Sequence, residues 1–245
     1  MNRPAYALFM MLALITFLVV RWLMPKSPSM AKLPWQIQWA LAFSAFLGGI
    51  LGAKLPFIIM NQDDPTNFWA WASDGKTITT GLFGAYLGVE LGKLLWGITA
   101  KTGDSYALPL ACAMTVGRLG CFFNGCCYGT VCKLGWAVNF GDGVPRHPIQ
   151  IYESLFHASM AFILLSFMKQ GWLQRHRLKF YLIGYAIFRF LTEYLRPEPI
   201  LWQGLTFYQI VAFTGAMALM VQWWFDARVS TAVSEDQNSP TFSRV

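Results

Sequence analysis

Charged residues are scarce in this chain. They make up 13% of its 245 residues, whereas 56% are hydrophobic and the mean hydropathy is +0.42. Soluble domains carry roughly 25% charged residues, so the composition excludes an ordinary soluble domain. No long polar block interrupts the apolar segments either. The sequence therefore predicts a single polytopic membrane domain over residues 1–225, followed by a polar, disordered cytoplasmic tail over 226–245.

A concentrated basic patch is also missing, although the net charge is +7. The Lys and Arg residues are scattered between apolar segments, as expected for loops on the cytoplasmic side of a membrane. We therefore expect a membrane environment and no nucleic-acid partner. The first apolar segment lacks a clear small-residue cleavage site, so it is expected to be a retained helix rather than a signal peptide.

Seven apolar segments are long enough to cross about 30 Å of hydrocarbon. More basic residues fall in the odd-numbered loops and the tail than in the N-terminus and the even-numbered loops, which predicts an N-terminus outside and a C-terminus in the cytoplasm. The expected fold is an all-α integral membrane protein of about seven transmembrane helices, at approximately 6–24, 35–60, 78–98, 106–123, 151–168, 179–196 and 202–225.

Two local features concern helix packing. Glycines recur through the second and third segments and favour a close crossing of the two helices; they stand at positions 48, 49, 52, 81, 84, 88 and 92. Glu90 and Lys93 are three residues apart and are expected to form a local helix pair with little functional weight.

Three basic residues, Lys54, Arg118 and Arg189, lie inside apolar segments. A charge in hydrocarbon is costly unless it is paired or hydrated, so each is a functional candidate. In the predicted topology all three share one depth with Glu153 and Glu193. The pairs Arg118–Glu153 and Arg189–Glu193 could simply join helices. Three cations against two carboxylates nevertheless leave positive charge, which the phosphate of an outer-leaflet phospholipid would balance.

A polar run opens the fifth segment, and Pro148 within it is typical of a helix start. His147 can titrate near neutral pH. It is either a catalytic or substrate-orienting residue, or a structural residue at the helix entrance. The polar side chains beside it are those of Gln150, Tyr152 and Glu153.

Four of the five cysteines are crowded into a short stretch, at Cys121, Cys126, Cys127 and Cys132. Three interpretations are open. An oxidising outer face favours disulfides. A nucleophilic Cys126 or Cys127, activated by His147 or Glu153, would make the protein a covalent transferase. A metal site is less favoured, because adjacent cysteines are unlike the usual C-x2-C spacing of ligands.

Taken together, these motifs resemble the prolipoprotein diacylglyceryl transferase family over roughly residues 45–225. The two most specific matches are Gly117-Arg118-Leu119-Gly120 with Asn124 and Tyr128, and the run from His147 to Glu153. Supporting matches are Gly52-Ala53-Lys54-Leu55, Gly184-Tyr185 with Arg189, Glu193 to Pro197, and Gln209.

The resemblance implies an enzyme of the bacterial inner membrane. Such an enzyme moves the diacylglyceryl group of phosphatidylglycerol to the lipobox cysteine of a prolipoprotein and releases glycerol phosphate, with no metal or organic cofactor. Arg118 and Arg189 would bind the phosphate, and Glu193 would shape the head-group pocket. The resemblance adds His147 and Glu153 as catalytic candidates. The substrate-binding candidates are Lys54, Asn124, Tyr128, Gln150, Tyr152, Arg196 and Gln209.

Three positions depart from the family pattern. Cys121 stands where typical members have Asn, Cys126 where they have Glu, and Thr79 where they have His. Two alternatives therefore remain open beside the transferase: a phosphatidylglycerol-using transferase with a different acceptor, and a non-catalytic phospholipid-binding membrane protein.

Overall fold

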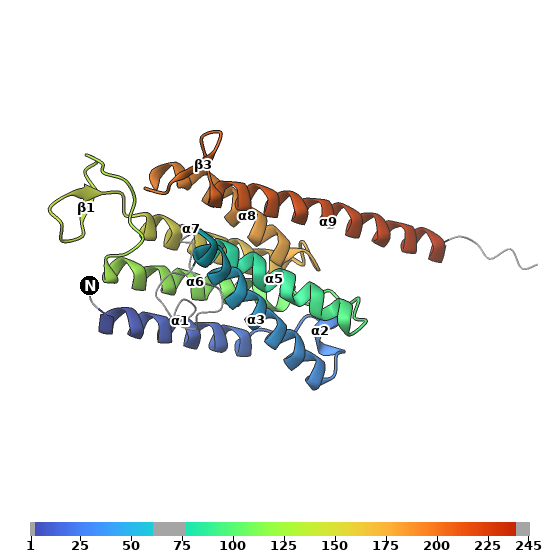
Figure 1. Ribbon diagram of the computed structural model, residues 1–245. Coiled ribbons are helices and arrows are strands. Elements are labelled where there is room, and N and C mark those ends of the chain that lie inside the picture. Colours follow the sequence, from blue (N-terminus) through green and yellow to red (C-terminus); the bar gives the residue numbers. More distant parts are fainter. Residues whose placement is uncertain (1–2, 61–76, 239–245) are drawn as a thin grey trace, which may run out of the picture.

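The computed structural model describes residues 3–60 and 77–238 and is built mainly from long helices (Figure 1). These are α1 (Arg3–Leu23), α3 (Trp35–Met60), α5 (Ile78–Leu95), α6 (Asp104–Asn124), α7 (Ile149–Gln170), α8 (Arg177–Thr192) and α9 (Phe207–Asn238). Each corresponds to one predicted segment. The short elements are α2 (Pro28–Ala31), the 3-10 helix η1 (Glu193–Leu195), and the strands β1 (Val138–Asn139), β2 (Pro145–Arg146), β3 (Ile200–Trp202) and β4 (Leu205–Thr206).

Five of the long helices are apolar and long enough to cross a membrane, at Pro4–Leu23, Trp35–Lys54, Asp104–Asn124, Ile149–Gln170 and Phe207–Arg228. The helices α5 and α8 are shorter, with 18 and 16 residues. The protein is thus mostly helical with five candidate membrane spans, and the count of seven spans stays a prediction.

The helix α9 continues beyond the expected end of its segment. It passes Phe225 and remains helical to Asn238, so residues 226–238 are helical rather than disordered as expected. This stretch contains neither proline nor glycine, so nothing in it stops the helix. Residues 239–245 lie outside the described part of the chain.

Neighbouring helices pack in pairs along the bundle: α1 with α6, α3 with α5, α6 with α7, and α8 with α9. A buried apolar core lies between α6, α7, α8 and α9, formed by Ala107, Leu108, Ala111, Met160, Leu164, Tyr181, Leu182 and Leu219. Large apolar side chains such as Leu14, Trp39 and Phe213 are exposed instead. An apolar outer surface of this kind is what a lipid environment requires.

The predicted glycine crossing between the second and third segments is confirmed. A Cβ atom built on Gly48 would lie 2.3 Å from the carbonyl oxygen of Gly84, and one built on Gly52 would lie 2.4 Å from that of Thr80. Backbone therefore meets backbone at this crossing, and there is no room for a methyl group between α3 and α5.

Replacing Gly48 with Ala is accordingly expected to destabilise the protein by about 1–3 kcal/mol, the usual cost of overpacking. The neighbouring Gly49 provides a matched control, because its Cβ would lie 3.5 Å from Ala85 Cβ, an ordinary contact. Thermal unfolding in detergent should show a clearly lower midpoint for Gly48→Ala than for Gly49→Ala. Equal midpoints would contradict the close crossing.

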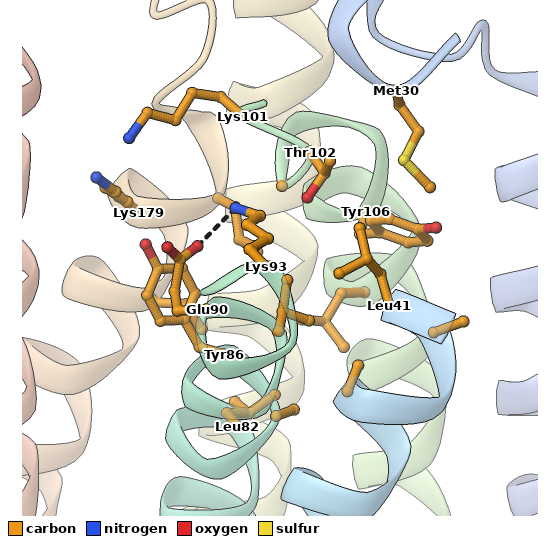
Figure 2. Close-up of a pocket in the computed structure, with 18 of the residues that line it drawn as sticks. Met30, Leu41, Leu82, Tyr86, Glu90, Lys93, Lys101, Thr102, Tyr106 and Lys179 are labelled. Atoms are coloured by element: carbon orange, nitrogen blue, oxygen red, sulfur yellow. Dashed lines mark hydrogen bonds and ion pairs between the residues drawn. The ribbon is translucent and has the colours of Figure 1, made fainter. Parts of the chain in front are cut away.

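A cavity of about 400 Å³ lies at the end of the bundle where α5 ends and α6 begins (Figure 2). Leu41 and Leu82 belong to its apolar wall. Lys93 Nζ lies 2.7 Å from Glu90 Oε1, which confirms the predicted local pair. Lys101 and Lys179 both form ion pairs with Asp226 of α9.

Candidate active site

Four helix ends converge at the opposite end of the bundle, where α6 ends, α7 begins, α8 ends and α9 begins. A cavity of about 510 Å³ lies there, which we call the arginine cavity. It is lined by side chains of α1, α5, α6, α8 and α9, together with Arg196 and Glu198, which follow η1. The residues of its lining that carry polar or reactive groups are Tyr6, Thr77, Thr79, Arg118, Cys121, Cys126, Cys127, Arg189, Arg196, Glu198 and Tyr208.

Glu153, from the first turns of α7, is the centre of an ion-pair network beside the arginine cavity. Its side chain is fully buried. Arg118 Nε pairs with Glu153 Oε2, Arg196 Nη2 lies 2.8 Å from Oε1, and Arg189 Nη1 lies 3.7 Å from Oε1. Arg189 Nη2 also lies 2.8 Å from Glu193 Oε2. The predicted pairs Arg118–Glu153 and Arg189–Glu193 are therefore both confirmed.

Arg196 has two carboxylate partners in this network. The expected neighbour Glu193 lies 4.0 Å away, from Arg196 Nε to Glu193 Oε2, but the closer partner is Glu153, which the spacing did not indicate. The reason is that α8 ends at Thr192 and η1 redirects the chain toward α7. Glu153 consequently shares its charge among three guanidinium groups from three parts of the chain.

Positive charge exceeds negative charge in this buried network. Three guanidinium groups face two carboxylates, and the Nε atoms of Arg189 and Arg196 are buried without a hydrogen-bond partner in the described part of the chain. Buried donors of this kind are costly unless an acceptor satisfies them. A phosphate group offers several acceptor oxygens and matches the planar guanidinium fork. The arginine cavity is therefore suited to a phosphate-bearing ligand.

The second carboxylate, Glu193, is held from the start of α9. Thr206 Oγ1 donates a hydrogen bond to Glu193 Oε1 at 2.9 Å. Gln209 accepts a hydrogen bond from the Thr206 amide through Oε1 and donates one to the Phe190 carbonyl through Nε2. Gln209, expected to bind substrate, thus fixes the corner between β4 and α9, and Thr206 is a supporting residue that the sequence did not indicate.

His147 belongs to an outer layer rather than to the described lining of the arginine cavity. Its Nδ1 lies 3.3 Å from the Tyr152 hydroxyl, which also accepts a hydrogen bond of 2.8 Å from Trp136 Nε1. Tyr128 stacks on Phe140, with ring centroids 5.3 Å apart. These aromatic contacts pack the β1–β2 region against the start of α7, outside the described lining of the arginine cavity.

Three further residues that the sequence singled out, Lys54, Asn124 and Gln150, lie on different helices. Lys54 is buried on α3 but is not part of the described lining. Asn124 is buried as the last residue of α6. Gln150 is fully buried, and its Nε2 donates a hydrogen bond of 2.5 Å to the Cys126 carbonyl. Gln150 therefore positions the cysteine-rich turn from the neighbouring helix α7.

All five cysteines are free thiols, so the disulfides favoured from the sequence are not formed here. Three of the Sγ atoms, those of Cys121, Cys126 and Cys127, lie within 4.8 Å of one another. We call these residues the thiol cluster. The chain is turned back by left-handed backbone conformations at Gly125 and Cys127, with φ of 67° and 61°. Cys132 is not part of this group.

Within the thiol cluster one group is predisposed to ionise. Hydrogen bonds with the thiols of Cys121 and Cys126, together with the positive charge of Arg118, lower the pKa of the Cys127 thiol well below its usual value. Cys127 is also exposed and lies beyond the end of α6. A thiolate is therefore expected at this position at neutral pH.

Alkylation should reveal this thiolate. In chelator-containing buffer, the rate at which iodoacetamide modifies Cys127 is expected to change little between pH 8 and pH 6, because the lowered pKa keeps the thiolate populated. A thiol with an ordinary pKa near 8.5 would react roughly 75-fold more slowly at pH 6 than at pH 8. Mass spectrometry of the modified peptide gives the rates, and protein unfolded in urea serves as the control. If the alkylation rate of Cys127 depended on pH equally in folded and unfolded protein, its pKa would not be lowered by the fold.

Four of the polar lining residues were not singled out from the sequence: Tyr6, Thr77, Glu198 and Tyr208. Tyr208, in the first turn of α9, lies under the guanidinium of Arg189, whose Cζ is 5.4 Å from the ring centroid. Glu198 follows η1 and is half-buried. Glu198 and Tyr208 lie near the start of the last predicted span, and only the folded chain shows that this part of the chain returns to Arg189.

The fold and the site define the class of protein: a helical membrane protein with a buried, electropositive cavity at one end of its bundle. A family model described as prolipoprotein diacylglyceryl transferase matches residues 4–225. The chain therefore belongs to the prolipoprotein diacylglyceryl transferase family.

Individual relatives agree with this assignment. The chain is 31% identical over 218 residues to the phosphatidylglycerol–prolipoprotein diacylglyceryl transferase of Pasteurella multocida, covering 81% of this chain and 77% of the relative. It is 33% identical over 170 residues to the enzyme of the same name from Clostridium tetani, covering 65% and 68%. The corresponding enzyme of Photobacterium profundum is 29% identical over 241 residues, with 89% of each chain covered.

Proposed function

We propose that this protein transfers the diacylglyceryl group of phosphatidylglycerol to the thiol of the lipobox cysteine of a prolipoprotein. The observation that carries the proposal is the surplus of buried guanidinium groups at the arginine cavity. Relatives named for this reaction support it. The substrates are a phospholipid and a protein thiol, and the protein is a multi-pass enzyme of the bacterial inner membrane.

The orientation follows from the distribution of basic residues. We place the N-terminus outside and the C-terminus in the cytoplasm, with α5 and α8 completing seven transmembrane helices. The arginine cavity then opens at the outer face. That is the side on which a translocated prolipoprotein and the outer-leaflet lipid meet, so both substrates reach the cavity without crossing the membrane.

The reaction requires a displacement at carbon. The thiolate of the acceptor attacks the terminal glyceryl carbon of the diacylglyceryl group, a C–S bond forms, and the C–O bond to phosphate breaks. Glycerol phosphate leaves with the bonding electrons and a growing negative charge. Arg118 and Arg189 hold that charge, and Glu153 keeps the two guanidinium groups oriented. Glu193, itself held by Thr206, orients Arg189 from the other side.

A reconstituted assay tests this function. Purified protein in phosphatidylglycerol liposomes is given a lipobox peptide, and mass spectrometry follows thioether formation while released glycerol phosphate is measured separately. We expect both products in equal amounts. Folded, lipid-binding protein that forms neither product would overturn the proposal.

A transferase with another acceptor is a second candidate, because Cys121 and Cys126 replace the polar residues usual in the family. The same assay separates the two functions. Release of glycerol phosphate that depends on membrane extract but not on the lipobox peptide would favour another acceptor. Restoration of lipoprotein modification in transferase-depleted bacteria would count against it.

A further inference from the structure

The thiol cluster is a feature that phosphate binding leaves unused. Cys121 comes from the last turn of α6, and the turn that follows brings Cys126 and Cys127 back to it. The hydrogen bond from Gln150 to the Cys126 carbonyl fixes the turn from α7. All three cysteines line the arginine cavity, so three soft donor atoms converge on one wall of the site.

The separation of the sulfur atoms matches the size of a metal site. Zinc bonds to cysteine sulfur at about 2.3 Å, so two sulfurs of a tetrahedral site lie about 3.8 Å apart. The three Sγ atoms already lie within 4.8 Å of one another, without any metal present. Adjustments of about 1 Å, within reach of side-chain rotation, would complete the geometry.

The surroundings favour the ionised form that a metal requires. Metal ligands from cysteine are thiolates, and nearby guanidinium groups stabilise thiolates. Arg118 lies on the same cavity wall, one helical turn before Cys121. A divalent cation would reduce the charge of three thiolates from about −3 to −1, which lowers the electrostatic cost of ionising them together.

We propose that Cys121, Cys126 and Cys127 bind one thiophilic divalent metal ion, of which Zn²⁺ is the common example, as three thiolate ligands. Soft thiolate ligands select such ions over Mg²⁺ or Ca²⁺. Cys132 stands outside the cluster, so the protein supplies three ligands rather than the four of a closed structural site. Because the three cysteines line the cavity, an exchangeable fourth ligand would reach the metal from the cavity.

The exchangeable ligand is the acceptor thiol, an inference that rests on the proposed transferase function. A thiol bound to zinc loses its proton to solvent and remains nucleophilic as a thiolate. The sulfur then forms the C–S bond while the C–O bond to phosphate breaks, with no change of oxidation state. Metal binding would thus supply thiol activation in a chain that has Cys and Thr where family members carry Asn, Glu and His.

Metal content provides the first test. The full-length protein is purified without a histidine tag, equilibrated with Zn²⁺, desalted and analysed by mass spectrometry of the elements. We expect about one zinc per chain in the wild type and in Cys132→Ser, and at least about tenfold less in Cys126→Ser and Cys121→Ser. Elution as a single peak in size-exclusion chromatography shows that each variant is folded.

Three results would overturn the metal site. They are negligible zinc in the folded wild type, unchanged zinc in both cluster variants, or a disulfide joining two of the three cysteines in protein prepared without reductant. Each Ser variant replaces a single sulfur atom, so the Cys132 control separates specific ligation from general thiol binding.

Cobalt substitution tests the acceptor step. The thiolate-to-cobalt absorption of Co²⁺-loaded protein should rise by about a third when a lipobox peptide adds a fourth thiolate, and a peptide with Ser in place of Cys should leave it unchanged. Full thioether formation by zinc-free protein would refute the metal's role and leave the transferase intact. Zinc binding without any thioether product would refute the transferase and leave the metal site intact.

Discussion

Replacing Arg118 with Gln is expected to lower kcat/KM for thioether formation by about 10²–10³-fold. This is the usual effect of removing one preorganised hydrogen-bond donor that stabilises negative charge developing in the transition state. Arg118 is 5% exposed, lines the arginine cavity and pairs with the fully buried Glu153. It is therefore fixed before substrate arrives and costs little reorganisation during the reaction. Gln retains a donor and much of the volume but loses the charge.

The measurement is the rate of glycerol phosphate release from phosphatidylglycerol liposomes, at several lipid fractions. Arg228→Gln is the control, because Arg228 stacks on Trp224 and lies 20 residues, about 30 Å along α9, from the cavity residue Tyr208. We expect wild-type rates for this variant. If Arg118→Gln turned over lipid at the wild-type rate while remaining folded, Arg118 would not hold the leaving phosphate.

The sequence predicts the helices well because hydrocarbon imposes a length on each apolar run. It also predicts the ion pairs of Arg118 and Arg189, because a charge at membrane depth needs a partner at the same depth. The positions and contacts of Gln209 and His147 were harder to predict from the sequence. Both stand next to turns, at β4 and at the β1–β2 region, and the path of a turn sets where such side chains point.

The thiol cluster shows a different limit of sequence analysis. Adjacent Cys126 and Cys127 are unlike familiar ligand spacings, and the turn that brings both sulfurs toward Cys121 contains left-handed conformations at Gly125 and Cys127. A non-glycine residue with positive φ is uncommon and is not indicated by residue type. The end of α9 at Asn238 was not indicated either, because polar composition alone does not end a helix over a stretch that contains no Pro or Gly.

Replacing Glu153 with Gln is expected to destabilise the protein by about 3–5 kcal/mol, the cost of removing one partner from a buried ion pair. Three guanidinium groups would lose their shared carboxylate at once. Glu90→Gln is the matched control at the other cavity: its pair with Lys93 is partly exposed, and pairs of this spacing contribute only about 0.2–0.5 kcal/mol.

Thermal unfolding in detergent micelles, with and without phosphatidylglycerol, measures both effects. Because the lipid phosphate would replace the missing negative charge among the arginines, the lipid should raise the unfolding midpoint of Glu153→Gln more than that of the wild type. The control variant should respond to lipid as the wild type does. A Glu153→Gln protein as stable as the wild type, or one that gains no additional stability from the lipid, would show that the buried guanidinium groups do not form the anion site.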